Sequence, residues 1–456
     1  MTPPVHLDGV RLVGGAGAVN LTAEAGRWTR VDGRTADSPR SGVQQAPLPP
    51  GGAGGRGSGS GSGLGTSPAQ APAPTALPQA PSRREGDSRT PLRGDSLSRP
   101  LAGPPTGGEE EWLRELVWCS GAIDPHINGW GGCDFLRDDP ADHRPALRAL
   151  CAAGVTGFLP TLITCSEAVL GTALDRWAAW AAAPPADAPS FFGLHLEGPF
   201  LDPARAGVHP PGQLRTPDAA WLAALLDPYP GLVRLLTLAP ELPGAMAVIE
   251  AAKARGVTVA LGHSSATVAD VEQAVARGAR YVTHLFNAMG PFHHRAAGLA
   301  GAALARADLY TEVIGDGHHV GPEGLAMAWR CLGVGRLVLV SDAVAAAGGG
   351  AKRFRMGEVE GRIVAGRAVD PEGRLCGGLA PPWEGVRRVA AAAGVGWEAV
   401  VPCTRATVIA ALALDAATGP APGEPADLVG LDHTGQVRAV LRGGAWLVAP
   451  SSGFRT

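Results

Sequence analysis

Polar residues able to bind a metal or transfer a proton stand at the ends of five short apolar segments of this 456-residue chain. They are, in chain order, His126, Glu197, His263, His284 and Asp342. Two imidazoles and one carboxylate are a common ligand set for a catalytic divalent metal that keeps a position open for water. Such a metal lowers the pKa of water and polarises an amide carbonyl, and a nearby carboxylate such as Asp342 can take the proton. The pattern therefore indicates metal-assisted hydrolysis.

Each of these residues has a structural explanation when it is taken singly. A histidine at the end of a strand is usually a hydrogen-bonded structural residue, and Asp342 could cap the helix that follows it. Glu197 precedes a Gly-Pro pair and could be a turn carboxylate. The shared position of all five residues within one repeating pattern favours a joint site over coincidence.

The repeating pattern is an alternation, from Gly121 onward, of short apolar runs with stretches of helical composition. Eight runs are predicted strands: 122–127, 155–162, 191–197, 233–241, 257–263, 280–285, 309–316 and 336–342. Several of the intervening helical stretches end at Gly, as is usual just past a helix C-terminus. Eight strand–helix units predict an α/β fold, a TIM-like (β/α)8 barrel with catalytic groups at the C-terminal ends of its strands. We therefore expect the five polar residues to meet at one mouth.

The remaining segments of the chain differ from the barrel in composition. Strand signals at 1–35, 109–120 and 426–456 predict a small β-sandwich domain built from both ends of the chain. Residues 36–108 are rich in Gly, Ser and Pro, and no aromatic residue occurs between Trp28 and Trp112. Such a segment buries too little apolar surface to offset its ordering entropy, so we expect a disordered insertion.

The barrel itself is expected over 121–350, followed by three further segments. Residues 351–380 are predicted to hold more strands of the small β domain and a substrate loop. Residues 381–425 are predicted to supply C-terminal helices of the barrel, and 426–456 to end the small domain.

Charge and cysteine content bound the function classes. The formal net charge is −3, from 39 basic and 42 acidic residues, and no basic run stands out, so we expect no nucleic-acid or membrane-surface partner. The seven cysteines include no CxxC pair and are odd in number, which favours a reduced, cytoplasmic protein. The N-terminus has no secretory-signal pattern, and no run of 18 apolar residues occurs.

Longer strings around the five residues resemble the N-acetylglucosamine-6-phosphate deacetylases, which are amidohydrolases. The strings are AIDPHINGWGG (122–132), HLEGPFL (195–201), GHSSAT (262–267), THLFNAM (283–289), PFHHRAAGLAG (291–301), GDGHHV (315–320) and LVSDA (339–343). They follow one another in the family's order. The resemblance implies an enzyme that removes the acetyl group of N-acetylglucosamine 6-phosphate, giving glucosamine 6-phosphate and acetate. It also implies a homodimer.

The resemblance carries residue roles with it. Glu197, His263 and His284 would hold one divalent metal, which we expect to be Zn²⁺, although Fe²⁺, Mn²⁺ and Co²⁺ suit the same ligands. Asp342 would be the general acid and base, and His209 would contact the acetyl carbonyl.

The same resemblance assigns the substrate contacts. They would come from Val208, His209, Asn287, Ala288, Arg295, Asp316, His319, Leu375, Cys376 and Gly377. Among them, Arg295 and His319 stand at the positions that bind the phosphate. A guanidinium suits a phosphate because it offers paired donors in a rigid fork.

One departure from the amidohydrolase pattern bears on the metal count. The first strand reads His126-Ile127-Asn128, where many amidohydrolases have a second histidine in place of the asparagine. Because an amide is a poor substitute for an imidazole ligand, we predict one tightly held metal, with His126 a candidate ligand of a weaker second one.

Two alternative functions stay open. The barrel could act on an isomeric N-acetylhexosamine phosphate, because the loops that read the sugar configuration are not placed by sequence. It could also be a non-catalytic sugar-phosphate-binding barrel. A degenerate barrel would be expected to have lost at least one predicted ligand or Asp342, and this chain keeps them all.

Overall fold

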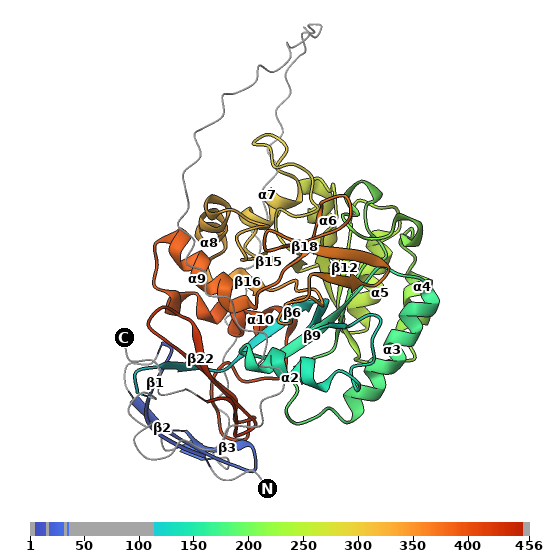
Figure 1. Ribbon diagram of the computed structural model, residues 1–456. Helices are drawn as coiled ribbons and strands as arrows, with labels where there is room; N and C mark the ends of the chain where they lie inside the picture. Colours follow the sequence, from blue (N-terminus) through green and yellow to red (C-terminus); the bar gives the residue numbers. More distant parts are fainter. Residues whose placement is uncertain (1–4, 15–17, 32–33, 36–113, 450–456) are drawn as a thin grey trace, which may run out of the picture.

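The computed structural model describes residues 5–14, 18–31, 34–35 and 114–449. It consists of a barrel of parallel strands covered by helices, with a separate sheet at one end (Figure 1). The predicted α/β fold class is confirmed. The predicted insertion at 36–108 lies outside the described residues.

Eight parallel strands form the barrel. In hydrogen-bonded order they are β6 (Ala122–Ile127), β9 (Val155–Ile163), β11 (Leu194–Glu197), β12 (Val233–Leu238), β13 (Thr258–Leu261), β14 (Tyr281–Val282), β15 (Tyr310–Ile314) and β16 (Leu337–Val340). The short strand β10 (Ser190–Phe191) also pairs with β9. A parallel bridge between Ile127 and Ala343 joins the first and last strands. Each of the eight predicted strand segments overlaps one of these strands.

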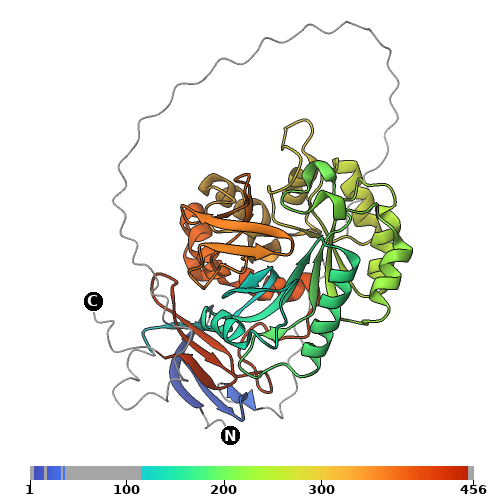
Figure 2. The same ribbon diagram turned by 45° about the vertical axis from the view of Figure 1, so that its right-hand side comes forward.

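Helices lie between the strands and cover the outside of the barrel (Figure 2). They are α2 (Arg144–Ala152), α3 (Glu167–Ala182), α4 (Ala219–Leu226), α5 (Ala245–Ala254), α6 (Val268–Arg277), α7 (Gly298–Ala305), α8 (Pro322–Arg336), α9 (Pro382–Ala393) and α10 (Ala406–Leu412). Local sequence explains their ends. Thr267 and Asp270 form a capping box at the start of α6, and Gly278, with φ of 118°, ends that helix.

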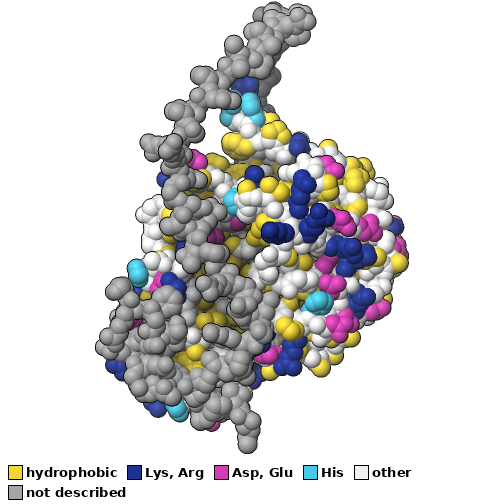
Figure 3. Space-filling model, in the orientation of Figure 1, with side chains coloured by type: hydrophobic (Ala, Val, Ile, Leu, Met, Phe, Trp, Pro, Cys, Tyr) yellow, Lys and Arg dark blue, Asp and Glu magenta, His cyan; other side chains and the backbone are white. Residues whose placement is uncertain are grey.

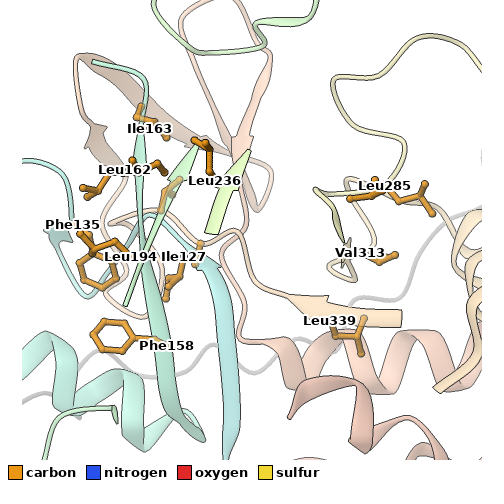
Figure 4. Packing of buried hydrophobic residues seen from close by; sticks show 14 of the residues in the cluster. Ile127, Phe135, Phe158, Leu162, Ile163, Leu194, Leu236, Leu285, Val313 and Leu339 are labelled. Atoms are coloured by element: carbon orange, nitrogen blue, oxygen red, sulfur yellow. The ribbon is translucent and has the colours of Figure 1, made fainter. Parts of the chain in front are cut away.

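The core between strands and helices fixes the positions of the strand ends. Phe135, Phe158 and Trp177 form an edge-to-face cluster with ring centroids 5.6–6.0 Å apart. Figure 4 shows Phe135 and Phe158 beside the aliphatic side chains of Ile127 and Leu194. Burying each such side chain stabilises the fold by about 1.5–3 kcal/mol, so the barrel forms a rigid frame for its mouth.

The separate sheet combines both ends of the chain. Its strand order is β23 (Ala445–Val448), β22 (Val437–Arg442), β21 (Leu428–Leu431), β5 (Val117–Cys119), β1 (Val5–Leu12), β2 (Ala18–Glu24), β3 (Arg27–Val31) and β4 (Arg34–Thr35). All neighbours are antiparallel except β1 and β5. Trp28 and Trp118 are buried in a core of its own.

The strands of 351–380 do not join this sheet, so that part of the domain prediction is wrong. β17 (Arg353–Met356), β18 (Val359–Val364), β19 (Arg367–Val369) and β20 (Leu375–Gly377) form a four-stranded sheet beside the barrel, drawn in orange in Figure 2. The Gly378 amide donates to the Asp342 carbonyl at 2.7 Å. This hydrogen bond and the parallel bridge between Ala343 and Gly378 hold the sheet at the barrel mouth, a constraint that strand patterning does not reveal.

All seven cysteines are unpaired, and Cys331 alone among them is exposed. No helix within the described ranges has the length and apolarity that crossing a membrane requires. Around the β17–β18 hairpin, Lys and Arg side chains are interspersed with Asp and Glu (Figure 3). Arg353, Arg355 and Arg362 of this hairpin line a cavity of about 550 Å³.

Candidate metal centre

The predicted site residues project from the C-terminal ends of the barrel strands. Glu197 is the last residue of β11, whereas His263, His284 and Asp342 each stand two residues after a strand. These last three have positive φ angles of 48°, 27° and 46°. Such a backbone costs about 1–3 kcal/mol at a non-glycine residue and persists where the surrounding fold imposes it. The strained turns hold these side chains within one buried cluster.

Three of these side chains converge on one point. Glu197 Oε1 lies 3.0 Å from His263 Nε2 and 3.1 Å from His284 Nε2, and the two nitrogens are 3.0 Å apart. The three side chains are at most 6% exposed. Nitrogen and carboxylate oxygen atoms this close suit the ligand shell of a small divalent cation. The geometry therefore fits the metal that the sequence predicted.

Hydrogen bonding fixes the ring of His263 in a form that can bind a metal. Its Nδ1 donates to the Arg205 carbonyl at 2.8 Å, which directs the Nε2 lone pair toward Glu197. Burial lowers the pKa of His263 to about 4, against the opposing effect of Glu197. A neutral ring with its second nitrogen hydrogen-bonded is typical of metal-binding histidines.

Glu197 is surrounded by imidazoles. Besides His263 and His284, His126 Nε2 lies 3.4 Å and His209 Nε2 3.6 Å from its Oε2. Burial alone would raise the pKa of Glu197, but the surrounding histidines, His126 first, hold it well below its usual value. Glu197 is therefore an anionic candidate ligand surrounded by histidine side chains.

Asp342 is oriented for proton transfer. Its Oδ1 accepts a hydrogen bond from Asn128 Nδ2 at 2.7 Å and lies 3.2 Å from His126 Nε2. Burial raises the pKa of Asp342 above the ordinary carboxyl value, which suits a group that takes up a proton and returns it. Asn128, which sequence reasoning treated as a lost metal ligand, thus positions the predicted general acid and base.

Glu312 is a residue that sequence reasoning missed. It is fully buried in β15, and its Oε2 lies 2.9 Å from His126 Nδ1 and accepts the His284 backbone amide at 3.2 Å. A carboxylate paired with a metal-binding histidine orients its ring and tunes its basicity, and the ring that Glu312 contacts is that of His126. A lone glutamate inside the apolar run LYTEVIGD was the available signal, because a charge there must have a buried partner.

His209 lies inside the cluster. It is 3% exposed, and its ring centroid is 4.6 Å from that of His263. The Thr164 amide donates to His209 Nδ1 at 3.3 Å, so that nitrogen is an acceptor and Nε2 carries the proton. The ring therefore offers an N–H donor beside Glu197.

Several predicted substrate residues border one cavity. Asp316, Leu375 and Gly377 line a space of about 150 Å³. Two arginines that sequence reasoning did not single out, Arg367 and Arg388, line it as well. This cavity therefore offers cationic groups beside part of the predicted substrate loop.

The other predicted contacts lie around the same mouth or next to it. His319 Nδ1 pairs with Asp316 Oδ2 at 2.8 Å. Asn287 Nδ2 donates to the carbonyls of His284 and Leu285 at 3.3 and 3.1 Å, and the carbonyl of Ala288 accepts from Ser264. Val208 is half-buried beside His209, and Cys376 is buried within β20.

Arg295 is not brought to the cluster. It is exposed on the loop before α7, which extends away from the barrel in Figure 1. Within the described residues, the Arg295 side chain contacts His294 of the same loop, with 2.8 Å between Arg295 Nη1 and His294 Nε2. The structure therefore separates the predicted phosphate arginine from the buried groups.

Comparison with individual known proteins shows the family to which the chain belongs. No family model matches the chain. The N-acetylglucosamine-6-phosphate deacetylase of Bos taurus is 37% identical over 340 residues, which cover 72% of this chain and 82% of the relative. The Bacillus subtilis deacetylase of the same name is 31% identical and covers 71% and 83%. The chain belongs to the N-acetylglucosamine-6-phosphate deacetylase family.

Solved structures agree with this membership. A mutant N-acetyl-D-glucosamine-6-phosphate deacetylase of Mycobacterium smegmatis, in complex with N-acetyl-D-glucosamine-6-phosphate, matches with a TM-score of 0.73 at 29% identity. The match covers 98% of this chain and 99% of that one. The deacetylase family also has a relative of different specificity. An N-acetylgalactosamine-6-phosphate deacetylase of Shewanella is 34% identical and covers 72% of this chain and 82% of the relative.

Proposed function

We propose that the chain hydrolyses the acetamide of N-acetylglucosamine 6-phosphate to glucosamine 6-phosphate and acetate. The observation that carries the proposal is the complete buried set of Glu197, His263 and His284 within a barrel of this deacetylase family. A barrel that had lost catalysis would have no reason to keep these ligands with Asp342 beside them.

The proposed cofactor is one Zn²⁺ per chain, which Glu197, His263 and His284 would hold. When bound, it would supply a Lewis acid for the amide carbonyl and a lowered pKa for water. His126 Nε2, between Glu197 and Asp342, is the proposed ligand of a weaker second ion.

Proton transfer is assigned to Asp342. Because Asn128 and His126 engage its Oδ1, Oδ2 is the oxygen left to take the proton of the attacking water. The same carboxyl would then return that proton to the nitrogen of the leaving amine, so that one group serves both steps. Its raised pKa favours this exchange.

Binding and orientation are assigned to the surrounding groups. His209 would donate its Nε2–H to the acetyl carbonyl, in accord with the acceptor role of its Nδ1. Asn287 and Ala288 would contact the sugar, and Arg295 and His319 the phosphate. Val208, Asp316, Leu375, Cys376 and Gly377 would form the walls of the substrate site.

An isomeric substrate is the second candidate. The Shewanella N-acetylgalactosamine-6-phosphate deacetylase is 34% identical, between the 37% and 31% of the Bos taurus and Bacillus subtilis glucosamine enzymes. Overall identity therefore does not separate the two configurations. We also propose a homodimer that works in the cytoplasm, to be examined by mass measurement in solution and by localisation of a tagged chain.

The test of the substrate proposal is acetate release from both 6-phosphates by the purified chain. A kcat/KM that is higher for the glucosamine isomer supports the proposal. A preference for the galactosamine isomer replaces it with the second candidate, and absence of release from either by a folded, metal-loaded protein contradicts both.

A further inference from the structure

A second group of candidate metal ligands lies outside the catalytic cluster. Cys133 begins β8 (Cys133–Asp134), which pairs with β7 (Gly129–Trp130), and Asp138 and His143 follow it before α2. One ligand atom of each of these three side chains lies within 4.8 Å of the other two. His143 Nε2 is 3.8 Å from Asp138 Oδ2.

Acidic side chains surround Cys133. The Cys133 side chain is completely buried, and the carboxylates of Asp138, Asp134 and Asp139 lie near it. The His143 ring contacts Asp138 at 3.8 Å, which is too long for a hydrogen bond. Within the described residues the ring therefore makes no hydrogen bond.

We propose that Cys133, Asp138 and His143 form a second metal site, separate from the catalytic one, for Zn²⁺ or a similar borderline cation. A thiolate, a carboxylate and an imidazole are ligands that Zn²⁺ accepts, and water would complete a four-coordinate shell. Metal binding would displace the thiol proton into solvent, and the two negative ligands would then balance the two positive charges of the ion.

The site would fasten the β7–β8 hairpin to the start of α2. This hairpin is next to Asn128, because the Phe135 amide donates to the Asn128 carbonyl at 2.9 Å. Asn128 in turn donates to Asp342. A metal at Cys133 would therefore stiffen the segment that holds the predicted general acid and base, although the binding proposal does not depend on the catalytic one.

The test is cobalt loading of the full chain after chelation. Two tightly bound Co²⁺ per chain, one in each three-ligand group, and a near-ultraviolet thiolate-to-cobalt band are expected. Cys133→Ser should abolish the band and one equivalent, and His143→Ala, at a half-exposed residue, should lower affinity for that equivalent at least 10-fold. Cys331→Ser, at the exposed cysteine, is the matched control and should keep both equivalents and the band.

A further variant separates the two sites. His263→Ala should remove the other equivalent while the near-ultraviolet band persists. The proposal is overturned if the wild-type chain binds one Co²⁺ without a thiolate band, or if the band survives in Cys133→Ser.

Discussion

The two ends of the proposed substrate site differ in how far the free chain has assembled them. At the amide end, Glu197, His263 and His284 are buried and in mutual contact, and each belongs to a different strand end of the barrel. At the phosphate end, Arg295 is exposed on a loop and contacts His294 of that loop. The barrel frame thus fixes the groups proposed for chemistry, while a loop carries one group proposed for binding.

The difference follows from what each group must do. Catalysis requires groups held in place before the substrate arrives, because reorganisation would add to the barrier. A phosphate can be captured by a charged side chain that orders on binding, at some cost in affinity. Substitutions at the amide end should therefore lower kcat, and those at the phosphate end should raise KM.

The largest effect is expected at Asp342. Asp342→Asn removes the proton acceptor while keeping the shape and the contact with Asn128, so kcat for acetate release should fall about 10²–10⁴-fold. Metal content should stay at the wild-type value. Substantial turnover by a folded, metal-loaded Asp342→Asn variant would exclude this residue as the general acid and base.

A smaller effect is expected at Glu312. Glu312→Gln keeps the size but loses the charge that pairs with the His126 ring and accepts the His284 backbone amide, so metal affinity or kcat should fall about 10–100-fold. Chelator competition measures the affinity, and Glu323→Gln, at an exposed glutamate in the first turn of α8, is the control. Equal metal affinity and equal kcat in both variants would show that Glu312 only fills space.

The phosphate end is tested by arginine substitutions. A charge-assisted hydrogen bond contributes about 1.5–3 kcal/mol, so loss of the phosphate arginine should raise KM about 10–100-fold for the phosphorylated sugar and little for the dephospho sugar. Arg295→Ala is proposed to do so. If Arg388→Ala does so instead, the cavity beside Asp316 is the phosphate site. Arg362→Ala, on β18, is the control.

The smallest effect is a pH dependence of stability in the chelated protein. Burial holds the pKa of His263 at about 4, below its ordinary value of 6.5, so the unfolded chain binds more protons between these limits. The contribution of the neutral His263 ring to the free energy of unfolding is complete above pH 6.5. It decreases as the pH falls toward 4, by about 3 kcal/mol at most. Denaturant titrations at several pH values measure it. His263→Gln should reduce the slope, and an unchanged slope would contradict the neutral buried ring.

The amide end could be predicted from sequence because its residues follow a rule of the fold. Ligand-capable side chains at the ends of parallel strands meet at one mouth, whatever their separation along the chain. His263 and Asp342 follow that rule. The partner of the strands at 351–380 could not be predicted, since alternation identifies a strand and not the sheet it joins.

The roles of the residues that support the metal centre could not be predicted from sequence for a related reason. Glu312 and Asn128 act through hydrogen bonds to residues from other strands, and those pairings exist in the folded barrel alone. The exposed place of Arg295 depends on loop conformation, which composition does not determine. The motif resemblance predicted a phosphate-binding role for Arg295 but could not predict where its side chain lies in the fold.

The most direct test of the central claim is acetate release from N-acetylglucosamine 6-phosphate before and after removal of the metal, with metal content measured on the same samples. The account predicts rapid release that stops on chelation and returns when about one equivalent of Zn²⁺ is restored. Release that persists in metal-free protein, or a folded and reloaded protein that releases no acetate, would contradict it.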